Sequence, residues 1–152
     1  MDFDTITLTR EVACPPDRLF HLMTDREARQ VWGAPDDRTV MRIDHHDLRP
    51  GGREVSVCGP KDNPEFAVTA DFHVVDAPRL LIMSETMEFG QGPASISLVT
   101  QEVAERPEGG SVLTVTVQVA SLIGEPMIDG YREGWGGSLA NLIRLAEAGV
   151  PA

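Results

Sequence analysis

The segment from residue 126 to residue 149 is PMIDGYREGWGGSLANLIRLAEAG, and it decides the fold. Its apolar residues recur at steps of three and four, the period of one face of an α-helix. Four interior glycines each cost a helix about 1 kcal/mol relative to alanine, so we expect close packing around the segment to offset that cost. The sequence predicts a long C-terminal helix, ended by Gly149 and Pro151. Its apolar face consists of Met127, Tyr131, Trp135, Leu139, Leu142, Ile143 and Ala146.

Seven other segments have the character of β-strands. Residues 5–12 and 112–119 alternate between apolar and polar side chains, which is typical of half-buried strands. In residues 65–75 the alternation predicts that Phe66, Val68, Ala70, Phe72 and Val74 share one face. Turns rich in glycine and proline separate most of these segments. The remaining candidate strands are residues 39–44, 53–58, 79–87 and 94–103.

Two short helices are predicted between the first and second strands. Pro15 and Pro16 break the first strand, and proline is tolerated in the first turn of a helix. Thr24 followed three residues later by Glu27 predicts a capping box with Thr24 as the N-cap of the second helix. We expect Gly33 to end that helix.

An antiparallel sheet with one apolar face needs a cover for that face. Only the segment 126–149 is large enough, and the two short helices can close one end. The sequence therefore predicts an α+β fold of the helix-grip type, in which a curved antiparallel sheet of about six to seven strands wraps around the long C-terminal helix. We expect residues 1–152 to form a single domain.

Composition excludes several classes of function. The net charge is −11, with one lysine and twelve arginines, so we expect neither nucleic acid nor membrane as a partner. No apolar run approaches the length of about 20 residues that spans a bilayer, and residues 1–4 resemble no signal peptide, so we expect a cytoplasmic location. Cys14 and Cys58 lack the spacing of a metal site and are predicted to be reduced thiols. No cofactor or metal is expected.

Several local patterns carry a resemblance to a known family, and they span most of the chain. Their order and spacing resemble the SRPBCC (START/Bet v-like) superfamily and, within it, the homologues of the heat-shock-protein-90 ATPase activator. The resemblance implies a fold with a central cavity, but fold alone does not fix function, and chaperone binding is not implied. The patterns are residues 16–20 (PDRLF) with Thr24-Asp25 and Trp32-Gly33, residues 47–52 (DLRPGG), residues 74–80 (VVDAPRL), and Gly134-Trp135 followed by Leu139 and Leu142.

The chain departs from the family's usual pattern at two places. Gly33 stands where a second tryptophan is common, and Asp76-Ala77-Pro78 replaces a more common Pro-Pro corner. Both lie near the expected cavity end, so the nature of the ligand stays open.

Large apolar side chains are the candidates for the wall of a cavity, because ligand pockets are mostly apolar with a few polar anchors. The same side chains could simply fill the core, and that alternative stays open. Glu85 alternates with Met83 and Met87, so it would be a buried carboxylate if that face points inward, or an exposed one if it points outward. The candidates are Trp32, Phe66, Phe72, Met83, Glu85, Met87, Tyr131, Trp135 and Leu139.

Other polar residues are assigned structural or surface roles. His45-His46-Asp47 is predicted to lie in an exposed polar loop, because neighbouring residues of a strand point to opposite faces and cannot easily share an ion. Arg49 and Arg53 are predicted to form surface ion pairs, and the alternative is that one of them holds a ligand carboxylate at the cavity mouth. His21 and His73 are predicted to be structural or solvent-facing, and no catalytic residue is assigned.

Three functions remain open. The first is a protein that binds a hydrophobic small molecule, with Tyr131 and Glu85 as polar anchors. The second is an enzyme of the cyclase or dehydratase kind that acts on a polyketide-like or aromatic substrate, with Glu85 or Tyr131 as its acid–base group. The third is a chaperone-associated protein-interaction domain. We rank binding first because no strong catalytic pair is present, and the resemblance also allows a homodimer.

Overall fold

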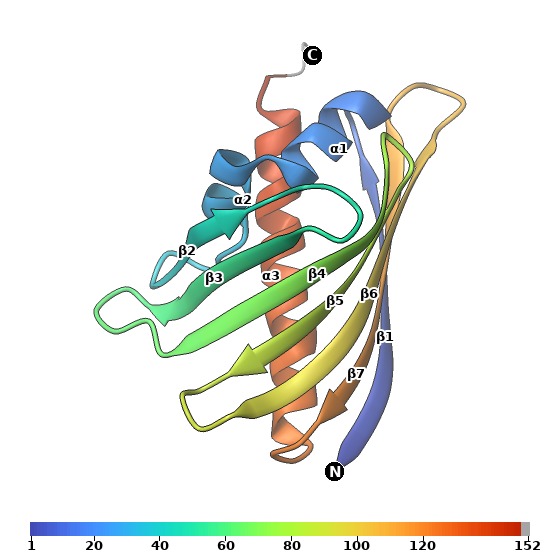
Figure 1. The fold of residues 1–152 in the computed structure, drawn as a ribbon. Helices are drawn as coiled ribbons and strands as arrows, with labels where there is room; N and C mark the ends of the chain where they lie inside the picture. Colours follow the sequence, from blue (N-terminus) through green and yellow to red (C-terminus); the bar gives the residue numbers. More distant parts are fainter. Residues whose placement is uncertain (150–152) are drawn as a thin grey trace.

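Figure 1 shows the computed structural model, which describes residues 1–149, as a seven-stranded antiparallel sheet curved around one long helix. The strand order is β1-β7-β6-β5-β4-β3-β2, so the first and last strands of the chain are neighbours. This confirms the predicted α+β helix-grip fold. Pro151, which was predicted to help end the C-terminal helix, lies outside the described residues. The elements are β1 (Asp2–Val12), α1 (Pro16–Thr24), α2 (Arg26–Trp32), β2 (Thr39–His46), β3 (Arg53–Pro60), β4 (Phe66–Asp76), β5 (Leu80–Glu88), β6 (Pro93–Glu105), β7 (Ser111–Ser121) and α3 (Pro126–Glu147).

The alternation of side chains along the strands places the apolar face of the sheet toward α3. In β7, Leu113, Val115 and Val117 are fully buried, as the pattern predicts. In β4 the prediction for Val74 is wrong, because an irregularity of register between Phe72 and Val74 shifts the alternation. Val75 therefore packs against the core and lies opposite the buried Leu81 of β5.

The two short helices follow each other without a loop. Asp25, and not Thr24, is the N-cap of α2: its carboxylate accepts a hydrogen bond from the Ala28 amide at 3.0 Å. Thr24 is the last residue of α1, and its hydroxyl donates to the Phe20 carbonyl at 2.9 Å. The predicted cap failed because Thr24 is still helical, whereas a cap residue needs the extended backbone that Asp25 adopts.

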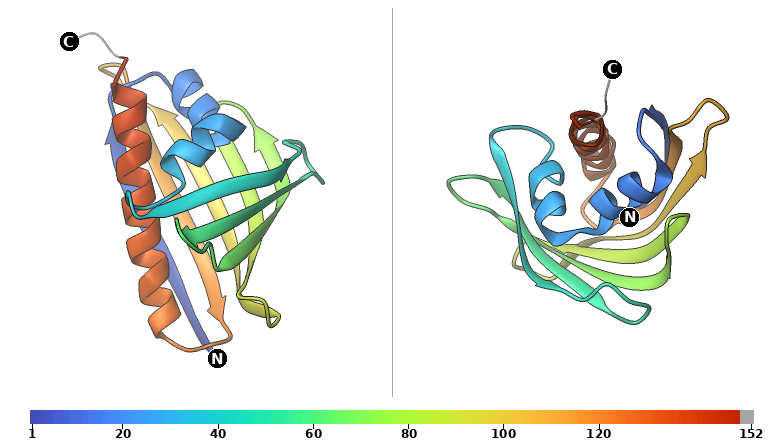
Figure 2. Two further views of the ribbon diagram at one scale, coloured as in Figure 1. Left: turned by 90° about the vertical axis from the view of Figure 1, so that its left-hand side faces the viewer. Right: turned by 90° about the horizontal axis from the view of Figure 1, so that it is seen from above.

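The long helix α3 lies along one side of the sheet and leaves the other side open. It packs against β1 and β7 and against α1 and α2, while β3, β4 and β5 curve away from its N-terminal half (Figure 2). Close packing compensates for only one of the four glycines. A Cβ at Gly137 would lie 2.8 Å from the Pro35 carbonyl oxygen, so only glycine fits there. At Gly130, Gly134 and Gly136 a Cβ would meet nothing within 4 Å.

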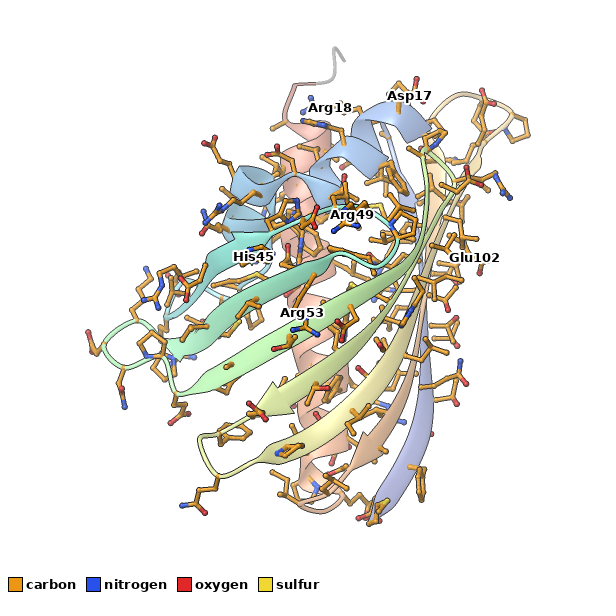
Figure 3. All side chains as sticks on the ribbon, in the orientation of Figure 1. Asp17, Arg18, His45, Arg49, Arg53 and Glu102 are labelled. Carbon is orange, nitrogen blue, oxygen red and sulfur yellow. The ribbon has the colours of Figure 1, made fainter. Side chains whose placement is uncertain are left out.

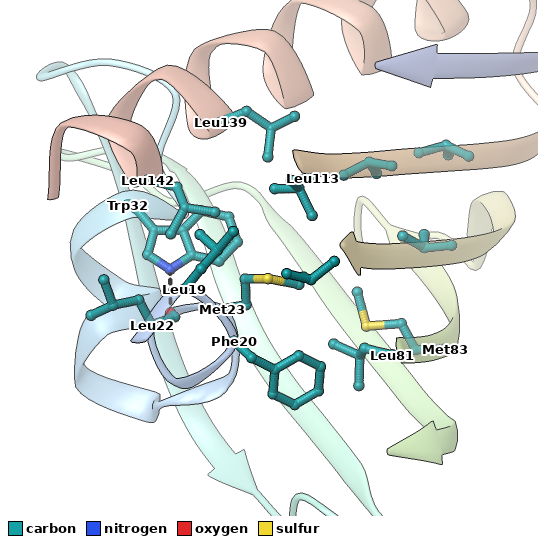
Figure 4. Close-up of a cluster of buried hydrophobic side chains, with 14 of the residues drawn as sticks. Leu19, Phe20, Leu22, Met23, Trp32, Leu81, Met83, Leu113, Leu139 and Leu142 are labelled. Carbon is teal, nitrogen blue, oxygen red and sulfur yellow. Dashed lines mark hydrogen bonds between the residues drawn. The ribbon is translucent and has the colours of Figure 1, made fainter. Parts of the chain in front are cut away.

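Buried apolar side chains gather where α1 and α2 meet the C-terminal half of α3 (Figure 4). Leu19, Leu139 and Leu142 are fully buried there, and each such side chain contributes about 1.5–3 kcal/mol of burial free energy. Trp32 is 2% exposed, and its indole N–H donates to the Leu22 carbonyl at 2.7 Å. We call this region, defined by Leu19, Leu139 and Leu142, the closed half, and Trp32 lies at its border.

Candidate functional site

A pocket of about 550 Å³ lies between the sheet and the N-terminal half of α3. It lies where β3, β4 and β5 curve away from the helix (Figure 2), so it is the space that α3 does not fill. Its walls come from α2, β2, β3, β4, β5 and α3, and Phe89 and Ile123 from the loops before β6 and α3 also line it. We call this region the open half. Its apolar lining includes Val40, Met41, Phe66, Val68, Met87, Met127 and Trp135.

Six of the nine predicted site residues line this pocket, and three do not. Phe72 and Met83 lie toward the closed half, where they line a separate hollow of only about 10 Å³. Leu139 is fully buried beneath α1 and α2. The division follows from the two short helices, which fill the space beside these three side chains. The six residues in the pocket are Trp32, Phe66, Glu85, Met87, Tyr131 and Trp135.

One face of α3 borders the pocket, and two of its positions carry no side chain. Gly130 and Gly134 are one turn apart and both line the pocket, with open space beside each Cα. Tyr131 and Trp135 follow them on the same part of the helix. The volume of the pocket therefore depends on glycine at these two helix positions.

Glu85 is the carboxylate that faces into the pocket from β5. Its neighbours across the sheet are Ala70 of β4 and Ser97 of β6, which are both buried on the concave face. The register thus turns Glu85 inward with Met83 and Met87. Among the described residues it has no hydrogen-bond or ion-pair partner, and it lines the pocket.

A chain of three charged or titratable side chains lies beside Glu85, at the border between the two halves. Arg29 of α2 donates to Glu54 of β3 at 2.7 Å, and the Nδ1 atom of His46 lies 3.0 Å from the other Glu54 oxygen. The Arg29 guanidinium also lies over the Trp32 ring, 4.8 Å from its centroid. Glu54 is 3% exposed, so this is a buried ion pair.

The surroundings of these groups shift their acidities. Burial raises the pKa of Glu85 to about 7; the Arg29 guanidinium opposes that shift and the Glu54 carboxylate adds to it. Burial also acts to raise the pKa of Glu54, but the Arg29 charge and hydrogen bond, with His46, outweigh it and lower that pKa overall. A pKa near neutrality is the property of a group that can exchange a proton at physiological pH.

Tyr131 supplies a second polar group to the pocket. Its hydroxyl and that of Ser95 are 2.7 Å apart and share a buried hydrogen bond. Burial raises the pKa of Tyr131, and the nearby Glu85 carboxylate adds to the shift. Ser97, which is opposite Glu85 in the sheet, is 1% exposed and does not line the pocket.

Sequence patterns did not identify Arg29 and Glu54 as site residues. Arg29 precedes Trp32 by three positions, so the helical period could have placed both on one face. His46 was wrongly predicted to be in an exposed loop. It is the last residue of β2 and lies opposite Glu54 in the register with β3, which brings its ring to the carboxylate.

The other polar predictions concern the outside of the molecule (Figure 3). Arg49 pairs with Asp47 at 2.9 Å and Arg53 with Asp71 at 3.0 Å, which confirms the predicted surface ion pairs. His45 is exposed on the sheet. The exposed side chains of His21 and His73 agree with their prediction, and His73 shares a hydrogen bond with Ser84 at 2.8 Å.

Three further findings concern thiols, metal ligands and membrane helices. Cys14 and Cys58 are both free thiols, and Cys58 lines the pocket. Over residues 1–149, no three histidine, cysteine, aspartate or glutamate side chains lie close enough together to hold a metal ion. No helix in the same range has the length and hydropathy needed to cross a membrane.

The comparison with solved structures shows the same fold in bacterial proteins. A protein from Rhizobium loti is 31% identical, with 93% of this chain and 96% of that chain covered and a TM-score of 0.81. A protein from Rhizobium leguminosarum is 25% identical over 97% and 96%, with a TM-score of 0.84. An AHSA1-like protein from Aeromonas hydrophila is 25% identical over 95% and 93%, with a TM-score of 0.76.

No curated protein matches the chain significantly. The model of one family, described as Activator of Hsp90 ATPase homolog 1-like protein, matches residues 13–147. That match includes every element from α1 to α3 and confirms the resemblance to the SRPBCC superfamily. The chain belongs to the family of Activator of Hsp90 ATPase homolog 1-like proteins.

Proposed function

We propose that this protein binds a hydrophobic small molecule in the open half. The observation that carries the proposal is the pocket of about 550 Å³, which falls within the range of roughly 300–1,000 Å³ typical of ligand sites. Its wall is mainly apolar, and its few polar groups include Glu85, Tyr131 and Arg29. That combination suits a ligand with an apolar body and a small polar part.

The energetics of α3 support this proposal. Protein interiors are close-packed, so unfilled space of this size requires a reason. Glycine at positions 130 and 134 costs the helix about 1 kcal/mol each relative to alanine, and no close contact there compensates for it. A bound molecule would recover the burial that the open half lacks, because it would cover the apolar wall.

Native mass spectrometry on protein purified gently from its host tests the proposal, with denaturing extraction of whatever is bound. We expect a stoichiometric apolar molecule in the extract. Two variants sharpen the result. Gly134→Leu places a side chain in the pocket, whereas Gly136→Leu adds the same side chain to open space on the same helix but outside the pocket.

The predicted outcome is loss of the bound molecule from Gly134→Leu and its retention in Gly136→Leu. An empty wild-type protein that is not stabilised by a panel of hydrophobic metabolites would contradict the proposal. That outcome would favour a protein-interaction role, for which an exposed apolar patch is the relevant feature.

One observation favours a second candidate function, an enzyme of the cyclase or dehydratase kind. Glu85 has a pKa of about 7 and faces the pocket, so it could accept and return a proton at neutral pH. Turnover of a polyketide-like or aromatic substrate that Glu85→Gln abolishes, while binding persists, would establish catalysis. Binding of a molecule that is extracted chemically unchanged would contradict the enzymatic function and agree with the binding function.

A further inference from the structure

Glu85 is the one acidic side chain in the pocket wall, and it has no partner among residues 1–149. We propose that the molecule bound here is an apolar amine, whose protonated nitrogen pairs with the Glu85 carboxylate. The inference rests on the proposed binding function and adds the chemical class of the ligand.

The charges around the pocket favour a cation over an anion. Arg29 and Glu54 neutralise each other at 2.7 Å, and His46 lies on the far side of Glu54, 3.0 Å from its second oxygen. The ionised Glu85 is therefore the unbalanced charge of the site. A ligand carboxylate would add a second negative charge, whereas an ammonium group would neutralise the first.

The hydrogen-bonding groups of the pocket also favour an ammonium group over an anion. Both oxygens of Glu85 accept hydrogen bonds when the carboxylate is ionised, and they donate none. The hydroxyl of Tyr131 lies near Glu85 and is already bonded to Ser95. An ammonium group has three donors and no acceptor, so it complements this set of oxygens.

The apolar wall suits the rest of such a ligand. Phe66, Tyr131 and Trp135 provide aromatic surface around the pocket, and aromatic faces attract cations as well as apolar groups. The net charge of −11 also raises the local concentration of cations near the protein. Both effects increase the affinity for an apolar amine relative to a neutral or acidic molecule of the same shape.

Binding of an amine should depend on pH through Glu85. The charged or titratable groups that face it are Arg29 from α2, Glu54 and Cys58 from β3, and Tyr131 from α3. With a pKa of about 7, Glu85 is mostly ionised at about pH 8 and mostly protonated at about pH 5.5. The preference for an amine is therefore expected at the higher pH and should fall at the lower one.

The test compares three probes that share one apolar skeleton: 1-naphthylmethylamine, 1-naphthylmethanol and 1-naphthoic acid. Their dissociation constants are measured by isothermal titration calorimetry at about pH 8 and about pH 5.5. At the higher pH we expect the amine to bind at least roughly ten-fold more tightly than the alcohol, and the acid to bind most weakly. The advantage of the amine should shrink several-fold at the lower pH.

Two variants locate the effect. Glu85→Gln should remove the advantage of the amine over the alcohol. Glu102→Gln makes the same change of charge at an exposed position of β6 (Figure 3) and should leave all three affinities unchanged. Circular dichroism confirms that both variants are folded.

Equal binding of amine and alcohol by the wild-type protein would overturn the inference and leave the proposed binding function intact. The same holds if Glu85→Gln and Glu102→Gln lower the affinity for the amine equally. Failure of the amine to bind at all would also overturn it, and the extraction experiment would then decide the binding function separately.

Discussion

The two halves of the space beneath the sheet differ in what α3 presents to them. In the closed half, α3 presents Leu139 and Leu142, which are fully buried against α1 and α2. In the open half, five and nine residues before Leu139, it presents Gly134 and Gly130, where a Cβ would meet nothing within 4 Å. The same helix thus packs closely in one half and borders open space in the other. The pocket depends on residue choice along α3 as well as on the curvature of the sheet.

Among the substitutions considered, one at the border between the two halves should have the largest effect on the free energy of unfolding. Glu54→Ala leaves Arg29 buried without its partner, and we expect it to lower the free energy of unfolding by about 3–5 kcal/mol. Asp71→Ala breaks the exposed pair with Arg53 and should cost less than about 1 kcal/mol. Urea denaturation measures both values. Equal losses of unfolding free energy would show that the buried ion pair contributes no more to stability than the exposed one.

Truncation of one side chain in each half tests the comparison directly. Leu139→Ala should cost about 2–5 kcal/mol, because it leaves a cavity in the closed half. Met127→Ala, at the pocket wall, should cost less than about 1.5 kcal/mol, because its side chain already lacks neighbours on the pocket side. Denaturation of both variants gives the difference, and a larger loss for Met127→Ala would break the comparison.

The pH dependence of stability isolates Glu85 in the open half. Its pKa is raised from 4.5 to about 7 in the folded protein, so between these values the native state holds more protons than the unfolded state. Its contribution to stability is therefore complete below about pH 4.5 and is lost as the pH rises through about 7.

Glu85→Gln has no such titration. Relative to wild type, this variant should gain on the order of 3 kcal/mol between about pH 4.5 and about pH 8. The pKa of Glu54 is lowered, so its titration changes stability in the opposite direction. Both proteins contain Glu54, so this effect cancels from the difference between their stabilities. Parallel curves of unfolding free energy against pH would show that Glu85 has an ordinary pKa.

The smallest expected effect comes from the glycines of α3. Gly134→Ala and Gly136→Ala should each raise the free energy of unfolding by up to about 1 kcal/mol, because alanine favours the helix and a Cβ fits at both positions. Thermal unfolding measures the gain. A loss of stability at position 134 alone would show that the wall of the pocket is packed there and not open.

Local sequence patterns predicted most of the fold. The alternation in β7 and the three- and four-residue period of α3 both arise from burial on one face, so they are visible in the sequence. The irregularity in β4 could not be seen in the sequence, because Phe72, Val74 and Val75 are all apolar. The pattern therefore does not show at which residue the alternation shifts. The cap of α2 was missed because Thr24 and Asp25 are both good cap residues.

The site could be predicted only in part. Glu85 stood out because a charged residue alternates with Met83 and Met87, although its direction required the register with Ser97. The pair of Arg29 with Glu54 joins residues 25 positions apart, and no local pattern encodes such a contact. The glycines of α3 were visible, but whether packing surrounds them depends on the distance between helix and sheet.

The most direct test of the open half as a binding pocket is a fluorescence titration with N-phenyl-1-naphthylamine, an apolar probe that brightens in apolar surroundings. The titration compares wild type, Gly134→Leu and Gly136→Leu. We expect saturable binding at one site in wild type and in Gly136→Leu, and an affinity at least roughly ten-fold weaker in Gly134→Leu. Absence of saturable binding to wild type, or an equal loss in both variants, would contradict the account.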